Sequence, residues 1–199
     1  MGGKLKRSID HNGNMKTILA SQSPRRRELL SAMGIAFEVA LREVDESFPD
    51  QLDPVAAVCH IAEKKARAFI DDITDELVIA ADTIVTFDGQ IFGKPMDKGH
   101  AVEMLTRLSG RKHEVITAVA LLHDGDIHLF HEVTEVHFRV LAEGEIEYYI
   151  DHYQPFDKAG AYGIQEWIGV VAVDKIVGSY TNVVGLPTAR LSKELRSRF

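Results

Sequence analysis

The chain has 199 residues, of which 45% are hydrophobic, so it can fill one core and lies near the upper end of single-domain length. The formal net charge of −7 argues against a nucleic-acid polymer as partner, and no apolar stretch reaches the roughly 20 residues that cross a bilayer. The single cysteine, Cys59, cannot form an internal disulfide, which favours a reducing compartment and a cytoplasmic location.

The first fifteen residues are polar and lack the apolar run of a signal peptide. Because the first apolar strand pattern begins directly after them, we expect residues 1–15 to be a disordered extension. Residues 16–199 are expected to form a single domain.

Three helix starts are marked by a capping residue. Ser23 and Asp53 each precede a proline at the first helical position, and Asp97 precedes a third apolar stripe. Glycines are expected to end two of these helices. The predicted helices run from Pro24 to Gly34, from Pro54 to about Ile70, from Asp97 to Gly110, from about Glu143 to Tyr153, and from Pro187 to Arg196.

The remaining apolar runs are rich in β-branched residues and are predicted to be strands. The turn Asp88-Gly89 and the polar turn at 123–126 each separate two such runs, as in hairpins. Hairpins beside helical crossovers favour an α/β fold with a mixed sheet over a purely parallel one. The predicted strands are residues 17–20, 77–87, 90–92, 114–122, 127–140 and 170–177.

Arg25, Arg26 and Arg27 occupy the first turn of a predicted helix, where the helix dipole already disfavours cations. The neighbouring hydroxyls of Ser21 and Ser23, the free N–H groups and the planar guanidinium groups together suit a phosphate. The sequence therefore indicates an anion site here. The alternative is a solvated basic turn.

Asp82 lies inside an apolar run, where a carboxylate is costly to bury unless it is paired or bound to metal. It could serve as a general base for water or as a ligand of Mg²⁺. A structural salt bridge is the alternative. The acidic cluster Glu43, Asp45 and Glu46 could add a second carboxylate, although most such clusters are solvated.

Lys65, beside an apolar helix stripe, and Lys94 could also reach phosphates, although each is compatible with an ordinary surface lysine. Residues 89–94 resemble a phosphate loop only faintly, because the glycine spacing is short by one and Pro95 stands where Ser or Thr would bind Mg²⁺. Dinucleotide, zincin and α/β-hydrolase motifs are absent from the sequence.

Five segments in order resemble the Maf family. The first, SQSPRR, is similar to the SxSPRR signature of that family, and the last, DKAGAYGIQ, is long enough to be specific. Together they cover about residues 17–190. The segments are residues 21–26, 65–66, 81–83, 93–95 and 157–165.

The resemblance implies the fold of Maf and inosine-triphosphate pyrophosphatase proteins, an elongated mixed sheet flanked by helices with a cleft between two lobes. It also implies a homodimer. The expected activity is hydrolysis of nucleoside triphosphates between the α and β phosphates, giving the monophosphate and pyrophosphate. A divalent cation, Mg²⁺ or Mn²⁺, is the expected cofactor and would lower the pKa of the attacking water.

Roles follow from the resemblance, residue by residue. Asp82 would be the proton acceptor and a metal ligand, and Glu46 a second metal ligand. The trio Arg25, Thr83 and Gln165 resembles that of the dTTP/UTP group, and a glutamine amide suits the N3–H and O4 edge of uracil or thymine. The expected substrate contacts are Ser21, Arg25, Arg26, Lys65, Thr83, Lys94, Lys158 and Gln165.

Two other functions remain open at this point. Maf proteins are also linked with septum formation, so a nucleotide-sensing regulator of cell division is one alternative. A pure sensor would need the arginines but would have no use for a buried base at Asp82. A pyrophosphatase for modified nucleotides is the other alternative.

Overall fold

The computed structural model describes residues 15–199, so the predicted extension lies outside the described residues except for Met15. The strands are β1 (Thr17–Leu19), β2 (Glu38–Val39), β3 (Leu77–Phe87), β4 (Gln90–Phe92), β5 (Lys112–His123), β6 (Asp126–Phe138) and β7 (Val173–Val177). The helices are α1 (Pro24–Ala32), α2 (Pro54–Arg67), α3 (Lys98–Leu108), α4 (Glu143–Tyr153), α5 (Trp167–Ala172), α6 (Tyr180–Val184) and α7 (Thr188–Arg198). Two 3-10 turns, η1 (Pro155–Asp157) and η2 (Ala159–Ala161), follow α4.

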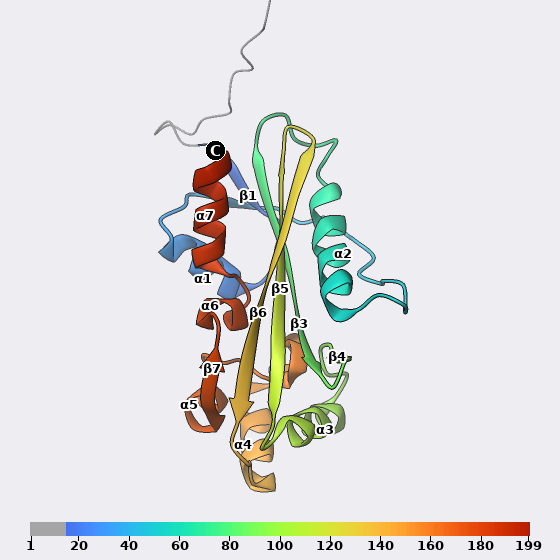
Figure 1. Ribbon diagram of the computed structural model, residues 1–199, viewed down its shortest axis with the longest axis vertical. Coiled ribbons are helices and arrows are strands. Elements are labelled where there is room, and N and C mark those ends of the chain that lie inside the picture. The colour runs from blue at the N-terminus through green and yellow to red at the C-terminus, as the bar shows by residue number, and fades with distance from the viewer. Residues whose placement is uncertain (1–14) are drawn as a thin grey trace, which may run out of the picture.

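The seven strands form one sheet, and its mixed character was predicted from the sequence. Their order is β2-β1-β3-β5-β6-β7, and β4 pairs with β3 beside β1. The pairs β2–β1 and β1–β3 are parallel, and the others are antiparallel. Figure 1 shows the long strands β3, β5 and β6 running along the long axis of an elongated molecule.

A gap between two short strands opens one edge of β3. On that edge β1 pairs with residues 77–79 and β4 with residues 85–87. Residues 80–84 of β3 face the gap between them, while the opposite edge is paired continuously with β5. Because neighbouring side chains of a strand point to opposite faces, the gap gives access to both Asp82 and Thr83.

Three hydrophobic clusters divide the molecule into two lobes. The upper lobe has one cluster under α2, including Val58 and Phe69, and another under α1 and α7, including Leu30 and Leu191. Alternate residues of β3 and β5 point into these two clusters, which lie on opposite faces of the sheet. The lower lobe has a third cluster, in which α3, α4 and α5 pack on the far ends of the strands (Figure 1).

The predicted helix caps are confirmed. Ser23, Asp53 and Asp97 each accept a hydrogen bond from the backbone N–H three residues further on. Helix α2 ends at Arg67 rather than near Ile70, and turns follow it. Strand β2 and helix α6 were not predicted, because both are short and lack a periodic apolar pattern.

The prediction of one strand over residues 170–177 is wrong in its first part. Helix α5 ends at Ala172, and β7 starts only at Val173. Ile168 and Ala172 are buried four residues apart, while Val170 between them is 80% exposed. This helical spacing shows that packing in the lower lobe overrides the β propensity of the valines.

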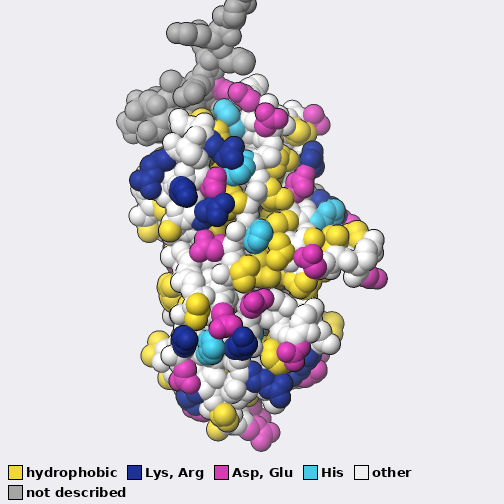
Figure 2. All heavy atoms as spheres, viewed as in Figure 1, with side chains coloured by type: hydrophobic (Ala, Val, Ile, Leu, Met, Phe, Trp, Pro, Cys, Tyr) yellow, Lys and Arg dark blue, Asp and Glu magenta, His cyan; other side chains and the backbone are white. Residues whose placement is uncertain are grey.

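Charges of both signs are mixed on the face in Figure 2, where Lys and Arg occur in several separate groups with Asp and Glu between them. Hydrophobic side chains gather in a band along the middle of this face. Within residues 15–199, none of the helices combines the length and apolar character needed to cross a bilayer.

A buried histidine in the lower lobe predicts how stability depends on pH. His113 is 2% exposed and its ring packs against Phe138 and Tyr162. Burial, assisted by the nearby His137, lowers the pKa of His113 to about 3. Below the unfolded pKa of about 6.5, the unfolded chain therefore binds a proton that the folded chain does not.

Stability is expected to fall as the pH drops from 6.5 towards 3, with this group contributing up to about 1.4 kcal/mol per pH unit. His113→Gln keeps a polar partner for the Tyr162 hydroxyl but cannot bind a proton. Urea unfolding of both proteins between pH 7 and 4 should show a shallower loss in the variant. If both proteins lose the same free energy of unfolding as the pH falls, His113 binds its proton in the folded protein and this prediction is wrong.

Candidate active site

One cavity of about 640 Å³ opens at the gap in β3. Its size is in the usual range for small-molecule sites. Residues from both lobes line it, so it is a cleft of the predicted kind. All ten site residues expected from the sequence line this cavity: Ser21, Arg25, Arg26, Glu46, Lys65, Asp82, Thr83, Lys94, Lys158 and Gln165.

Arg26 is 9% exposed and is held by four hydrogen bonds to the protein. Its Nε donates to the Gly185 carbonyl at 2.8 Å, and Nη1 donates to the Ala81 carbonyl at 2.8 Å and to Ser21 Oγ at 3.2 Å. Nη2 donates to Thr83 Oγ1 at 3.0 Å. Burial lowers the pKa of Arg26, and the charge of Asp82 opposes this shift. The guanidinium thus joins α1 to the open edge of β3.

Ser21 presents a donor at the same place. Its Oγ accepts from Arg26 and from the backbone N–H of Ser23, both at 3.2 Å. A hydroxyl has one proton and two lone pairs, so the Ser21 proton is left to donate to a ligand. An anionic oxygen is the natural acceptor for it. Arg27, by contrast, is exposed and does not line the cavity.

Two carboxylates meet at one ammonium group on the α2 side of the cavity. Lys65 Nζ lies 2.7 Å from Asp82 Oδ1 and 3.0 Å from Glu46 Oε1. The side chains of Lys65 and Asp82 are 17% and 14% exposed, whereas that of Glu46 is 53% exposed. Of the acidic cluster, only Glu46 lines the cavity, and Asp45 instead binds Ser47.

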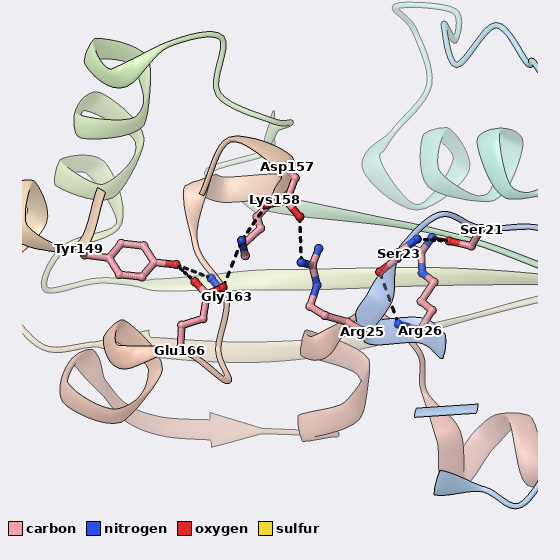
Figure 3. A network of polar contacts seen from close by, with 9 residues as sticks. All are labelled: Ser21, Ser23, Arg25, Arg26, Tyr149, Asp157, Lys158, Gly163 and Glu166. Carbon is pink, nitrogen blue, oxygen red and sulfur yellow. Dashed lines mark hydrogen bonds and ion pairs between the residues drawn. The ribbon is translucent and has the colours of Figure 1, made fainter. Parts of the chain in front are cut away.

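A chain of polar contacts crosses the cleft from α1 to the lower lobe (Figure 3). Arg25 Nη1 donates to Asp157 Oδ2 at 3.0 Å, and Lys158 Nζ lies 2.7 Å from Asp157 Oδ1 and 3.1 Å from Glu166 Oε1. The Tyr149 hydroxyl donates to Glu166 and accepts from the Gly163 N–H. Burial raises the pKa of Asp157, but hydrogen bonds from Lys158 and Arg25 outweigh it and lower the pKa.

Glycines bring the segments of the lower lobe close together. The Gly160 N–H donates to the Gly93 carbonyl at 3.1 Å, which ties the DKAGAYGIQ segment to the loop that carries Lys94. Gly160 has a φ of +69°, and a Cβ there would lie 2.7 Å from Val85. A Cβ on Gly169 would lie 1.7 Å from the Ile164 carbonyl oxygen. Lys94 and Gln165 are both exposed at the rim.

The two arginines of the SQSPRR segment have different partners in the structure. Arg26, not Arg25, contacts Thr83, whereas Arg25 pairs with Asp157. Consecutive helix residues point about 100° apart, so only one of them can face β3. Sequence reasoning missed Tyr149 and Glu166. Glu166 directly follows the DKAGAYGIQ segment, which was the one available signal, and Tyr149 had none.

Comparison with known proteins identifies the family. The family described as "Maf-like protein" matches residues 16–198. The chain belongs to the Maf family. Among its relatives is a protein named "dTTP/UTP pyrophosphatase" from Bacteroides fragilis, with 50% identity over 183 residues that cover 91% of this chain and 95% of the relative. A protein of the same name from Phocaeicola vulgatus is 51% identical over the same shares of both chains.

The fold is confirmed by a solved structure as well. The HAM1 protein from Coxiella burnetii matches with a TM-score of 0.50 over 92% of this Maf chain and 98% of that chain, at 15% identity. At this identity the likeness concerns the fold alone. The Maf motifs in this chain are therefore the residues that bear on function.

Proposed function

We propose that this protein hydrolyses nucleoside triphosphates, dTTP and UTP foremost, between the α and β phosphates to the monophosphate and pyrophosphate. The observation that carries the proposal is the arrangement of charge in one cavity, with a carboxylate pair on one side and arginine and lysine side chains around the rest. The names of its relatives from Bacteroides fragilis and Phocaeicola vulgatus support the same activity.

The cationic side chains are assigned to the phosphates. Ser21 offers a hydroxyl proton, and Arg25, Lys94 and Lys158 offer positive charge from both lobes. A triphosphate carries several negative charges, and its oxygens can accept charge-assisted hydrogen bonds from these side chains. Binding in a cleft of this kind also excludes water from the reacting atoms.

Asp82 is assigned as the general base. Its side chain is 14% exposed at the open edge of β3, and its Oδ1 forms an ion pair with Lys65 Nζ at 2.7 Å. In this role Asp82 accepts a proton from the attacking water. The water oxygen forms a bond to the α phosphorus, and the bond between that phosphorus and the leaving pyrophosphate breaks. Lys65 keeps Glu46 and Asp82 together despite their like charges, so it prepares the site before substrate binds.

Asp82 and Glu46 are the residues that would hold a divalent cation. Within the described chain, no three or more acidic, His or Cys side chains come together as a complete metal cage. Mg²⁺ commonly takes one or two carboxylates and completes its shell with phosphate oxygens and water, so this pair fits a cation that enters with the substrate. Such a cation would lower the pKa of the attacking water.

Thr83 and Gln165 are assigned to the base of the nucleotide. Both line the cavity, and Arg26 acts on this side through its hydrogen bond to Thr83. The Gln165 amide has both a donor and an acceptor, so its N–H can bond to O4 of uracil or thymine and leave N3–H for a second acceptor.

An assay of a nucleoside triphosphate panel tests the proposal. With Mg²⁺ or Mn²⁺, purified protein is expected to release pyrophosphate from dTTP and UTP faster than from ATP or GTP. Orthophosphate as first product, or a purine preference, would contradict it. Tight binding without turnover would favour the nucleotide sensor, and faster turnover of modified nucleotides would favour the other alternative.

We also propose a homodimer and a cytoplasmic location. The free Cys59 supports a reducing compartment, and the net charge of −7 argues against nucleic-acid polymers as partners. Sedimentation of the purified protein tests the dimer.

A further inference from the structure

A chain of three hydrogen bonds runs from the core to the cavity wall at Thr83. Thr117 Oγ1 donates to the Asn182 carbonyl at 2.9 Å, and Thr83 Oγ1 lies 2.9 Å from Thr117 Oγ1. Arg26 Nη2 donates to Thr83 Oγ1 at 3.0 Å. Thr83 and Thr117 are direct cross-strand partners in β3 and β5, so the sheet register holds the two hydroxyls together.

The number of available protons determines which group donates in each of these hydrogen bonds. A threonine hydroxyl has a single proton, and a carbonyl can only accept. The Gly185 N–H also donates to the Asn182 carbonyl, yet two oxygens 2.9 Å apart still need a proton between them. Only Thr117 can supply it. Thr117 must then accept in its other contact, and Thr83 must donate.

The hydrogen bonds cannot reverse their donors and acceptors, because the residues furthest from the cavity are buried. Thr117 and Asn182 are both 0% exposed. Turning the Thr117 proton towards Thr83 would leave two buried oxygens facing each other, which is costly away from water. Thr83 thus donates its proton to Thr117 and accepts a hydrogen bond from Arg26 with one lone pair. The second lone pair of Thr83 is what remains for a ligand in the cavity.

We propose that Thr117 is a positioning residue that fixes Thr83 as a hydrogen-bond acceptor, and that this selects a base presenting an N–H group. Uracil and thymine carry N3–H at the position where cytosine has a lone pair. A cytosine N3 would meet the Thr83 lone pair without a proton between them. This inference rests on the proposed function and specifies how it separates the pyrimidines.

Thr117→Val tests the inference, because it keeps the shape of the side chain and removes the acceptor for the Thr83 proton. Thr83 could then donate to cytosine N3. We expect the ratio of kcat/KM for dTTP to that for dCTP, measured by pyrophosphate release, to fall by about tenfold or more. The change should lie mainly in KM, since the variant leaves Asp82 and Lys65 in place.

Two controls separate polarity from packing. Thr117→Ser retains the hydroxyl and should keep the wild-type ratio. Thr86→Val makes the same change at a buried threonine in β3 that is outside this series of hydrogen bonds, and should leave the ratio unchanged. If Thr117→Val does not fold, Thr117→Cys, whose thiol is a weak donor and acceptor, should lower the ratio in the same direction.

An unchanged ratio in Thr117→Val or Thr117→Cys, or dCTP turnover that stays undetectable while dTTP turnover persists, overturns the inference and leaves the proposed function intact. A fall as large in Thr117→Ser or Thr86→Val also overturns it, because packing would then be the cause. Wild-type protein that releases no pyrophosphate from dTTP contradicts the proposed function itself, and this inference with it.

Discussion

Asp82→Asn is expected to lower kcat for pyrophosphate release by a factor on the order of 10²–10⁴, the usual cost of losing a general base. Asparagine keeps the size of the side chain but cannot accept the water proton, and it is a poorer ligand for a cation. Nucleotide binding, measured by calorimetry, should survive better than turnover because the arginines and lysines remain. The melting temperature should stay close to that of the wild type, since Lys65 keeps Glu46 at 3.0 Å.

The competing interpretation is that Asp82 is only a structural partner of Lys65. Removing one member of a buried pair typically costs 3–5 kcal/mol, roughly, so that interpretation predicts a lower melting temperature with near-normal turnover. Arg25→Ala is the matched contrast. Its exposed pair with Asp157 contributes little stability, so it should weaken binding while kcat changes less. Arg26 is less suitable, because four hydrogen bonds tie it to the fold.

Gly169→Ala is expected to destabilise the protein by about 3 kcal/mol. A Cβ at this position would lie 1.7 Å from the Ile164 carbonyl oxygen, so the backbone must move. In a domain of this size the melting temperature should fall by roughly 10 °C. Because Ile164 precedes Gln165, kcat/KM for dTTP should fall as well, even at temperatures where the variant is folded.

Gly144→Ala is the control, because it makes the same change in a helix where nothing lies within 4 Å of the new Cβ. Alanine is the better helix former, so this variant should be more stable by roughly 0.5–1 kcal/mol. Calorimetric scans of both variants would show opposite signs. Equal small effects would mean that α5 can shift away from Ile164 without cost.

Local signals in the sequence determined where the first helices begin and which segments carry chemistry. A cap acts on the N–H group three residues away, so Ser23, Asp53 and Asp97 could be identified without knowledge of the fold. The mixed sheet followed from hairpin turns between β-rich runs. The ten predicted site residues came from charged groups in unfavourable places and from five ordered motifs, and they all line one cavity.

Only the tertiary structure decided how these residues are used. The Asp88-Gly89 turn predicted β4 beside β3, but no local signal placed β1 on the same edge, and the pairing of both strands there leaves Asp82 and Thr83 at a gap. Arg25 and Arg26 are neighbours in sequence, but their partners lie 132 and up to 159 residues away. A local pattern has no information about such contacts, because they depend on how distant elements pack. For the same reason the direction of the Thr83–Thr117 hydrogen bond became visible only when β3, β5 and α6 were placed together.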